Sequence, residues 1–366
     1  MFRVRSLRYT VYSLQNLRNL CNLCNLCDKD LISMFNVQRI CVICVVCFIC
    51  GSAPVHAQTR RKAVRAKVDS VLQSRYERVK YDTAFIGRPK ARLTLKGRVN
   101  VSGNSIHARG TVNDIYSKAH LRTSRKLTLA IAANYRGLSA GLALNPASIF
   151  GKKKDYELNV NFYSNRLSLD ASYHNSHTLS GDIERNGMSH LEEGYADMKV
   201  VNLAAYYTFN HRRFSYPAAF TQSYIQRRSA GSWLAGVSFQ GGTIKNSESA
   251  PATLPQMRIE ADNLGIGAGY GYNFVLGQKW LIHLSALPTV VVFNHNNLTI
   301  NGVRKSAKAM RFNMIFNERL ALVHNFSDRY FAGATAVMNN TLFDDEVVVI
   351  NQNKWRFRAF FGVRIP

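Results

Sequence analysis

Apolar and polar residues alternate with a period of two over most of the chain beyond residue 90. In one such segment Tyr156 and Leu158 alternate with polar neighbours, and the alternation returns after a short turn at Ser164-Asn165. Two alternating arms around a short turn are typical of a β-hairpin. The same period predicts strands over residues 91–101, 126–135, 137–145, 155–163, 166–175, 198–210, 232–241, 261–276, 279–293, 309–326, 330–339 and 354–365.

This pattern predicts an all-β fold, an antiparallel transmembrane β-barrel of about 12 strands over residues 91–366, with 10 to 14 strands as the range. Tight turns are expected at residues 136–137, 164–165, 277–278 and 327–328. The long connections 102–125, 146–154, 176–197, 242–260, 294–308 and 340–353 then fall on the other side. Because outer-membrane barrels keep their short turns in the periplasm, both termini are expected there.

Two features do not fit this scheme. The connection 211–231 is long, although its position assigns it to the side of the short turns. Glu318 falls on the apolar face of its strand, where a charge in the middle of the bilayer costs of order 2 kcal/mol. A β-bulge at Glu318, or a strand end standing above the membrane, would explain that residue.

A soluble barrel also alternates, so other features must separate the two classes. The polar positions of the strands are rich in Asn, Ser, Arg and Gly, which suits a wet lumen, and aromatic residues gather at the strand ends. No apolar run approaches the 18 residues or so that a membrane helix needs. A barrel in the outer membrane is therefore favoured over a soluble barrel.

The N-terminal region predicts export. Residues 34–57 have the charge, the short apolar stretch and the small-residue exit of a signal peptide, with cleavage expected between Ala57 and Gln58. Residues 1–33 are then a misassigned or low-complexity leader, and Met34 competes with Met1 as the start. Residues 58–90 form a periplasmic N-terminal extension, either a short helix or a flexible basic segment.

The composition removes several classes of site. All seven Cys lie at or before residue 50, so the mature chain has no thiolate metal site, disulfide or cysteine nucleophile. The net charge of +26 would suit nucleic acid, but an exported chain does not meet it. The expected partners are outer-membrane lipid, lipopolysaccharide phosphates and the barrel-assembly machinery, and no cofactor is expected. The phosphates would meet a basic outer rim: Arg122, Arg125, Lys152, Lys153, Lys154, Arg304, Lys305 and Lys308.

Basic residues share the inward face of the first and last strands, which must pair to close a barrel. We call them the basic seam: Arg92, Lys96, Arg98, Arg356, Arg358 and Arg364. The seam either biases a pore toward anions or pairs structurally with the inward carboxylates of Asp155, Glu157 and Asp170. On the 261–276 strand the inward positions 265, 267, 269 and 271 are all Gly, which leaves room for a plug or for long side chains.

One group of residues suggests catalysis. Asp170, His174 and Ser176 share a face of the 166–175 strand, and a His that activates a Ser is what outer-membrane lipid hydrolases use. That face points into the lumen, away from lipid, so a lipid-modifying hydrolase is only the alternative. His174 and His177 lie on opposite faces, so no metal site is predicted. The favoured function is a non-enzymatic narrow pore for small solutes, or a structural barrel.

Four segments also carry a resemblance: YDTAFIGRP at 81–89, and the stretches 156–181, 226–239 and 264–288. They resemble an uncharacterised family of Gram-negative outer-membrane barrels that is catalogued as a domain of unknown function. The resemblance covers roughly residues 80–366. It implies fold and location, and it brings no activity and no catalytic residues.

Overall fold

The computed structural model describes residues 70, 74, 80–91, 93–112, 115–135, 138–144, 155–184, 187–247, 256–277, 279–306, 313–344 and 348–365. The chain divides into two compact units, Met1–Ser70 and Val71–Pro366, and the barrel belongs to the second. The leader, the signal peptide with its Ala57-Gln58 cleavage site, and most of the N-terminal extension lie outside the described residues. Those assignments stay predictions.

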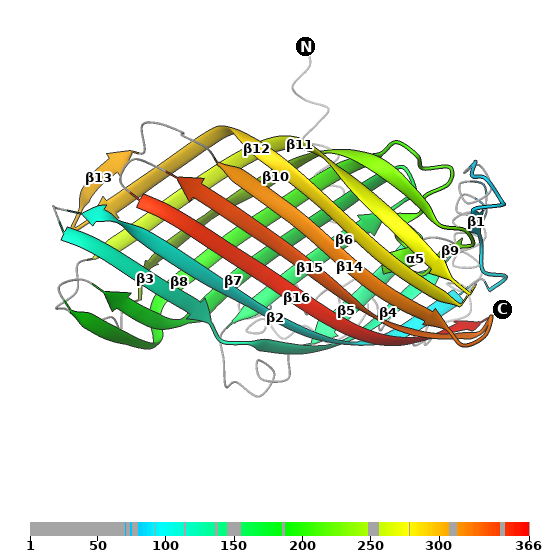
Figure 1. Cartoon of the computed structure of the whole chain (residues 1–366). Helices are drawn as coiled ribbons and strands as arrows, with labels where there is room; N and C mark the ends of the chain where they lie inside the picture. Colours follow the sequence, from blue (N-terminus) through cyan, green and yellow to red (C-terminus); the bar gives the residue numbers. More distant parts are fainter. Residues whose placement is uncertain are drawn as a thin grey trace, which may run out of the picture. The chain divides into compact units, whose positions relative to one another are not determined.

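The second unit is built almost entirely of antiparallel strands (Figure 1). Their bounds are β1 Ile86–Gly87, β2 Leu93–Val112, β3 Ile115–Thr123, β4 Lys126–Tyr135, β5 Leu138–Leu144, β6 Tyr156–Tyr163, β7 Leu167–Glu184, β8 Met188–Thr208, β9 Ile225–Gln226, β10 Ala230–Asn246, β11 Met257–Leu276, β12 Trp280–Ile300, β13 Val303–Ser306, β14 Met314–Asn325, β15 Tyr330–Asp344 and β16 Val348–Ile365. A single short helix, α5, spans Tyr216–Phe220 in the described chain.

Ten strands close into a ring in the order β2, β3, β7, β8, β10, β11, β12, β14, β15 and β16. The ring closes because β16 pairs with β2 from Val348↔Gly110 to Ile365↔Leu93. We call the end that carries the short turns and Ile365 the turn end, at the right of Figure 1, and the opposite end the hairpin end. The predicted pairing of the first and last strands is confirmed.

Three further strands, β4, β5 and β6, lie outside this ring in the turn-end part of the wall. β3 and β4 both pair with β2, one after the other along its length. The β2–β3 ladder ends at Ser105↔Arg122, and the β2–β4 ladder begins at Ser102↔Lys126. β5 pairs with β4, and β6 pairs with β7. Between β4 and β7, then, the strands β5 and β6 are added to the turn-end part of the wall only.

All twelve predicted strands are present, and the all-β antiparallel barrel is confirmed. The prediction that the connections 102–125 and 176–197 are loops is wrong. In the described chain they form the β2–β3 and β7–β8 hairpins, which extend the wall beyond the predicted strand ends. The closed ring includes β3, which is not among the twelve predicted strands, and leaves out the predicted strands β4, β5 and β6.

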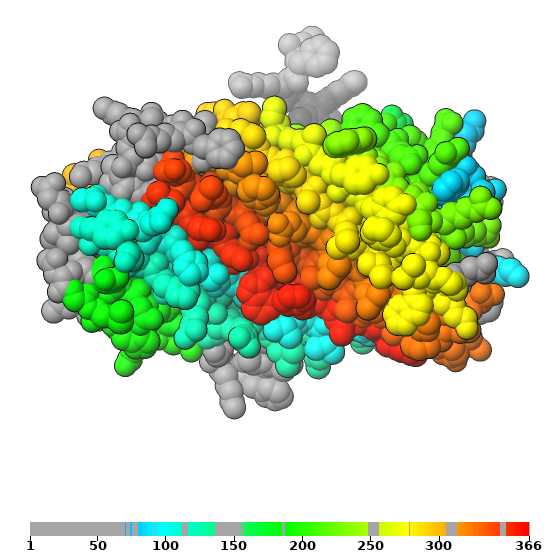
Figure 2. Space-filling view, viewed as in Figure 1, coloured from blue at the N-terminus to red at the C-terminus, as the bar shows by residue number. Residues whose placement is uncertain are grey.

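The outer face carries an apolar belt on the turn-end part of the barrel. Figure 2 shows β12, β14, β15 and β16 packed side by side on one face, coloured yellow to red. Large apolar side chains stand exposed on every part of this wall, among them Val99, Leu129, Ile131, Val160, Leu169, Trp233, Ile266, Leu284, Leu320, Phe357 and Phe361. An exposed apolar band around a closed barrel is what lipid would cover.

The polarity reverses toward the hairpin end. There the inner face holds a buried apolar cluster: Ile106, Leu121, Leu179, Leu191, Tyr195, Ala196, Met198 and Val200. The outer face carries polar residues such as Lys118, His120 and Glu184. A sheet with its apolar side inward and its polar side outward is suited to water.

Glu318 lies on the outer face of β14, as its position in the sequence indicates. The ladders of β14 with β12 and β15 run through Ala286↔Glu318 and Glu318↔Met338 without a register shift. The bulge considered as an explanation is therefore absent from the described part of β14.

Candidate functional site: the barrel lumen

The inner wall of the barrel carries charged and amide side chains, many of them buried. The inward basic residues outnumber the inward carboxylates in the middle of the lumen. The basic residues are Lys96, Arg98, Lys126, Arg319, Lys354, Arg356, Arg358 and Arg364, and the carboxylates are Asp155, Glu157 and Asp170. The lumen therefore has a surplus of positive charge.

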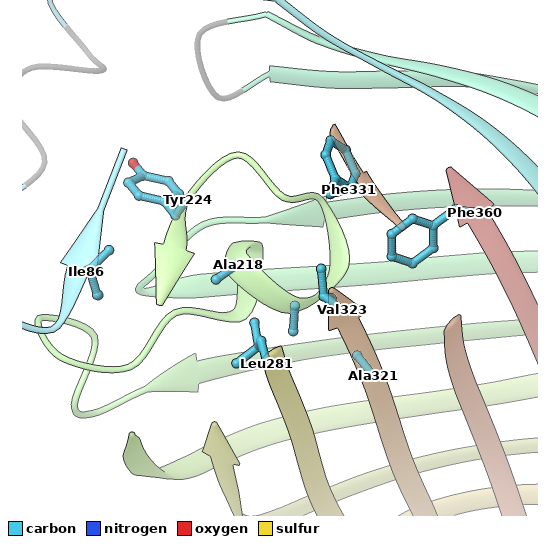
Figure 3. Packing of buried hydrophobic residues seen from close by; sticks show 9 residues of the cluster. Ile86, Ala218, Tyr224, Leu281, Ala321, Val323, Phe331 and Phe360 are labelled. Atoms are coloured by element: carbon cyan, nitrogen blue, oxygen red, sulfur yellow. The ribbon is translucent and has the colours of Figure 1, made fainter. Parts of the chain in front are cut away.

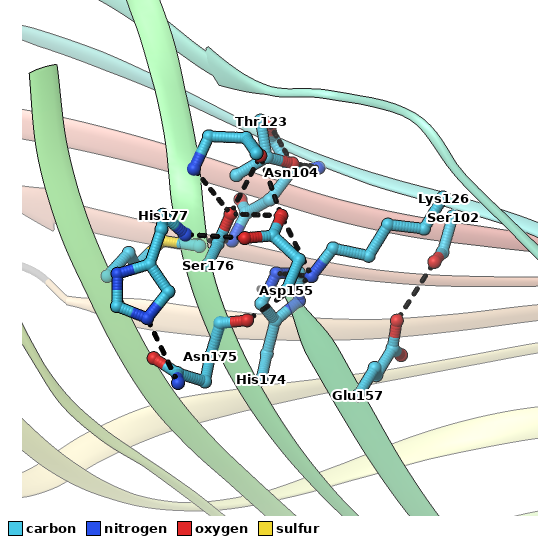
Figure 4. A network of polar contacts seen from close by, with 12 residues as sticks. Ser102, Asn104, Thr123, Lys126, Asp155, Glu157, His174, Asn175, Ser176 and His177 are labelled. Atoms are coloured by element: carbon cyan, nitrogen blue, oxygen red, sulfur yellow. Dashed lines mark hydrogen bonds and ion pairs between the residues drawn. The ribbon is translucent and has the colours of Figure 1, made fainter. Parts of the chain in front are cut away.

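The first polar network lies where β6 and β7 meet the boundary between β3 and β4 (Figure 4). The Asp155 carboxylate accepts hydrogen bonds from Ser176 Oγ at 2.8 Å and from Thr178 Oγ1 at 2.6 Å. Lys126 Nζ lies 3.5 Å from the same carboxylate, and both side chains are buried. The β7 ladder changes register just beyond Ser176, so this network fills the junction where β5 and β6 join the wall.

The catalytic alternative fails at this junction. His174 Nε2 lies 2.8 Å from Lys126 Nζ, while Ser176 Oγ donates to Asp155. The His174 and Ser176 side chains are 1% and 0% exposed, so neither faces lipid. Asp170 belongs to a separate ion pair. These residues do not form a base and nucleophile open to lipid, and the hydrolase alternative is not supported.

A second network links β6 to β16 and β2. Glu157 lies 3.5 Å from Arg356 Nη1 and 4.0 Å from Lys354 Nζ, and Ser102 Oγ donates to it at 2.9 Å. Arg356 also donates to the Asn159 side chain. One buried carboxylate thus serves two cations of the last strand.

A third network surrounds Asp170. Arg319 Nη2 on β14 lies 2.5 Å from this carboxylate, and the hydroxyls of Tyr163 and Tyr206 donate to it at 2.5 Å and 2.9 Å. The Arg319 guanidinium also lies 4.9 Å from the centre of the Tyr206 ring. The paired charges and the aromatic face offset the cost of removing Arg319 from water.

The structure brings part of the basic seam together on one inner wall. Arg358 lies opposite Asn100, and Arg98 lies opposite Phe360, in the β16–β2 ladder. Arg92 lies outside the described residues. Arg364 donates to Asn325 Oδ1 at 2.8 Å at the turn end.

Two seam residues form no ion pair with a described residue. The Nε atoms of Arg98 and Arg358 are buried and have no hydrogen-bond partner in the described chain. The carboxylates that the sequence offered as structural partners are engaged elsewhere, Asp155 by Lys126, Glu157 by Arg356 and Asp170 by Arg319. Structural pairing therefore accounts for Arg356 and leaves Arg98 and Arg358 unexplained.

The segment 209–229 folds into the turn end of the barrel, and we call it the plug. Ser215 caps α5 by accepting from Ala218 N at 3.3 Å, and Tyr216 OH donates to Ser285 Oγ at 2.8 Å on the wall. A Cβ at Gly271 would lie 3.1 Å from Phe214 Cζ, so this glycine leaves room for the plug. The long connection 211–231 that did not fit the predicted scheme is this inward-folded segment.

Lys96 of the seam fastens the plug. Its Nζ donates to the carbonyl oxygens of Phe220 at 3.3 Å and Thr221 at 3.2 Å, and to Gln222 Oε1 at 2.7 Å. These carbonyls end α5, where helix carbonyls have no partner within the helix and favour a cation. This seam residue therefore has a structural partner in the plug.

The plug also builds an apolar cluster with the strand ends (Figure 3). Its members are Ile86, Ala218, Ala219, Tyr224, Leu281, Ala321, Val323, Phe331 and Phe360. β1 joins this group by pairing with β9 through Ile86↔Gln226. Burial raises the pKa of Tyr224, and the Arg88 guanidinium beside it opposes that rise.

Little open space remains between the networks. A cavity of about 30 Å³ is lined by polar side chains that include Asn161, Ser172, Asn202 and Arg356. A water molecule needs about 10–15 Å³ by this measure, so the cavity holds about two waters and no larger solute. In the described residues no group of three or more His, Cys, Asp or Glu could hold a metal ion. No helix of the described chain is long and apolar enough to cross a membrane.

A family model described as a domain of unknown function (DUF4421) matches residues 80–364. The chain belongs to the DUF4421 family. The resemblance seen in the four sequence segments is thereby confirmed. No curated protein matches this DUF4421 chain.

Solved structures of low similarity to the DUF4421 chain include three bacterial proteins. The outer membrane protease OmpT from Escherichia coli has 8% identity and a TM-score of 0.40, with 75% of this chain and 97% of that chain covered. The translocator domain of autotransporter NalP from Neisseria meningitidis has 9% identity and a TM-score of 0.30, with 85% of this chain and 98% of that chain covered. The outer membrane protein OprG from Pseudomonas aeruginosa has 11% identity and a TM-score of 0.27, with 76% of this chain and 97% of that chain covered. Similarity this low identifies no shared activity.

The sequence analysis did not single out the lumen residues Lys126, Arg319 and Lys354. All three occupy positions of the predicted strands whose side chains point inward, so the alternation of the strands could have placed them in the lumen. The sequence gives no comparable signal for Phe214 and Tyr216, because apolar and polar residues do not alternate regularly in the plug.

Proposed function

We propose that this DUF4421 protein is an outer-membrane barrel whose narrow lumen admits small anions when the plug is displaced. The exposed apolar belt supports a place in a membrane, and the predicted signal peptide supports export. The polar hairpin end then faces outward and both termini face the periplasm. The exposed side chains of Arg122, Arg125 and Arg304 would meet lipopolysaccharide phosphates there, while Lys152–Lys154 and Lys308 lie outside the described residues.

The observation that carries the proposal is the pair Arg98 and Arg358. Both residues are half-buried, and removing a charge from water without an opposite charge beside it is unfavourable, so a lumen that served only as filling would use neutral side chains there. Rings of Arg and Lys favour anions in pores. A visiting anion would supply the charge that the described wall does not.

The conformation described here is closed. The plug fills the turn end of the barrel, where it packs against the strand ends. Conduction therefore requires the plug to leave its bonds to Lys96 and Ser285.

Planar-bilayer recordings of the refolded protein test the proposal. A salt gradient should give a reversal potential that favours anions, and Arg98→Gln with Arg358→Gln should reduce that preference. Lys96→Gln should raise the open probability by weakening the plug. Lys199→Gln, on the exposed outer face, is the matched control and should change neither quantity. A cation preference, or one unaltered by the double substitution, would contradict the assignment.

The small cavity favours a second candidate, a structural barrel with a filled lumen. In that case neither the wild type nor a variant lacking the plug conducts. The double substitution would then change stability alone, raising it because it removes two half-buried charges that form no ion pair with a described residue.

A further inference from the structure

The outer wall beside Glu318 contains a groove. It encloses about 540 Å³ and is lined by Tyr270, Tyr272, Phe274, Leu284, Ala286, Leu320, Ala336 and Met338, with Glu318 among them. The register explains its shape. Tyr270, Ala286, Glu318 and Met338 form one row across β11, β12, β14 and β15, and Tyr272, Leu284, Leu320 and Ala336 form the next row toward the turn end. The small side chains of Ala286 and Ala336 stand between large ones and leave the hollow.

Glu318 stands at the edge of the apolar belt. It lies eight residues along the chain from Phe326 at the turn end, which is roughly 27 Å along a strand and about 20 Å in height at a tilt near 40°. Since the belt of such barrels is about 25 Å tall, the carboxylate is close to its upper boundary. On the outer face Asn340 and Asn353 follow toward the hairpin end on β15 and β16, while the apolar residues Phe316 and Met314 follow Glu318 on β14 itself. By its height above the turn end, Glu318 lies in the upper part of the belt, near the membrane surface.

The groove is therefore polar at its Glu318 end and apolar along the rest of its length. Asn340 Nδ2 donates to Glu318 Oε2 at 3.4 Å, and this is the carboxylate's one hydrogen bond within the described chain. From there the lining runs through Leu320, Leu284 and Phe274 toward the turn end. This is the shape of an acyl chain that extends from a head group at the membrane surface.

We propose that this groove binds a membrane lipid whose head group carries a primary ammonium, with the ammonium at Glu318 and one acyl chain along the groove. The proposal rests on the membrane location proposed above. Charge complementarity selects the head group. The bare phosphates of an anionic lipid would be repelled by Glu318, whereas an ammonium can donate to its free oxygen.

A second copy of the chain fits the groove less well. A two-fold contact centred on this face would bring Glu318 toward Glu318 of the other copy, because two-fold interfaces pair the same patch with itself. Like charges at a membrane contact are unfavourable.

The native tryptophans allow a direct test. Trp233 pairs with Tyr270 and Trp355 pairs with Met338, so tryptophans flank both sides of the groove. The protein is reconstituted in nanodiscs containing a small fraction of phosphatidylethanolamine or phosphatidylglycerol with identical brominated acyl chains. Because bromine quenches tryptophan on contact, quenching reports how much of each lipid is adjacent.

In the wild type, brominated phosphatidylethanolamine should be enriched near the tryptophans by roughly two- to fivefold over phosphatidylglycerol, the range of an exposed ion pair. Glu318→Gln should remove the difference. Ala336→Phe should fill the groove and lower quenching by both lipids. Glu184→Gln, an exposed carboxylate at the hairpin end, is the control and should preserve the preference.

The other outcomes are informative. Equal quenching by the two lipids in the wild type would overturn the head-group assignment while leaving the barrel in the membrane. Quenching by neither lipid would overturn the membrane location itself. Dimers that cross-link through cysteines placed at Met338, and that strengthen with Glu318→Gln, would assign the groove to a second copy and overturn the lipid proposal.

Discussion

The junction at Asp155 should be a main point of stability in the barrel wall. The Asp155→Ala substitution removes the acceptor for Ser176 Oγ and Thr178 Oγ1 and the counter-ion of Lys126. Breaking one side of a buried ion pair costs about 3–5 kcal/mol, since the Lys126 charge stays buried after losing its carboxylate. The side chains of Asp155 and Lys126 are 2% and 5% exposed, so water cannot replace the lost partner.

The free energy of unfolding is measured by urea titration of the protein in lipid vesicles, followed by tryptophan fluorescence. Asp182→Ala is the matched control, because Asp182 also pairs with a cationic partner, His190 at 2.7 Å, but both side chains are about half exposed or more. That exposed pair is worth at most about 1 kcal/mol. The double variant Asp155→Ala with Lys126→Met should recover part of the loss, because it also removes the buried ammonium that has lost its carboxylate.

Two results would refute this reasoning. If Asp155→Ala costs no more than Asp182→Ala, the buried pair does not stabilise the junction. If the double variant is less stable than the single variant by the full cost of a second independent substitution, the two groups are not coupled.

Two further predictions concern the belt and export. Leu169→Arg should block assembly in vesicles, because a cation in the lipid-facing belt costs roughly 2–4 kcal/mol. Met188→Arg, at an exposed apolar position of the hairpin end, should assemble normally. Equal yields of the two variants on a heat-shift gel would argue against a membrane belt. N-terminal sequencing of the exported protein should begin at or near Gln58, and any retained cysteine would contradict the predicted cleavage.

The strands could be predicted because lipid and lumen impose opposite polarity on alternate residues. The alternation in 156–163 and 166–175 located β6 and β7 to within one or two residues at their turn. β3 was missed for a physical reason. At the hairpin end the apolar face turns inward, as Leu121 shows, and the outer face carries Lys118 and His120, so the lipid-facing pattern is lost.

The candidate site could be predicted only in part. Parity placed Lys96, Arg98 and Arg356 on the inner wall, but their partners depend on the folded chain. Lys96 binds carbonyls more than a hundred residues away in the plug, and no local pattern encodes that contact. His174 and Ser176 share a strand face in the sequence and in the fold, yet His174 contacts Lys126 while Ser176 donates to Asp155.

The register of the wall also bears on how such a barrel is built. The β3–β7 ladder pairs Lys118 with Glu184 and Thr123 with Leu179. Continued at the same offset, it would pair Lys126 with Ser176 and Tyr135 with Leu167, which are the residues that flank β5 and β6 in the chain. Instead the β3–β7 ladder ends at Thr123↔Leu179, and β5 and β6 take the place between β4 and β7. The barrel therefore has more strands in its turn-end part than in its hairpin end, and the change occurs at one place, next to the register shift in the β7–β8 ladder.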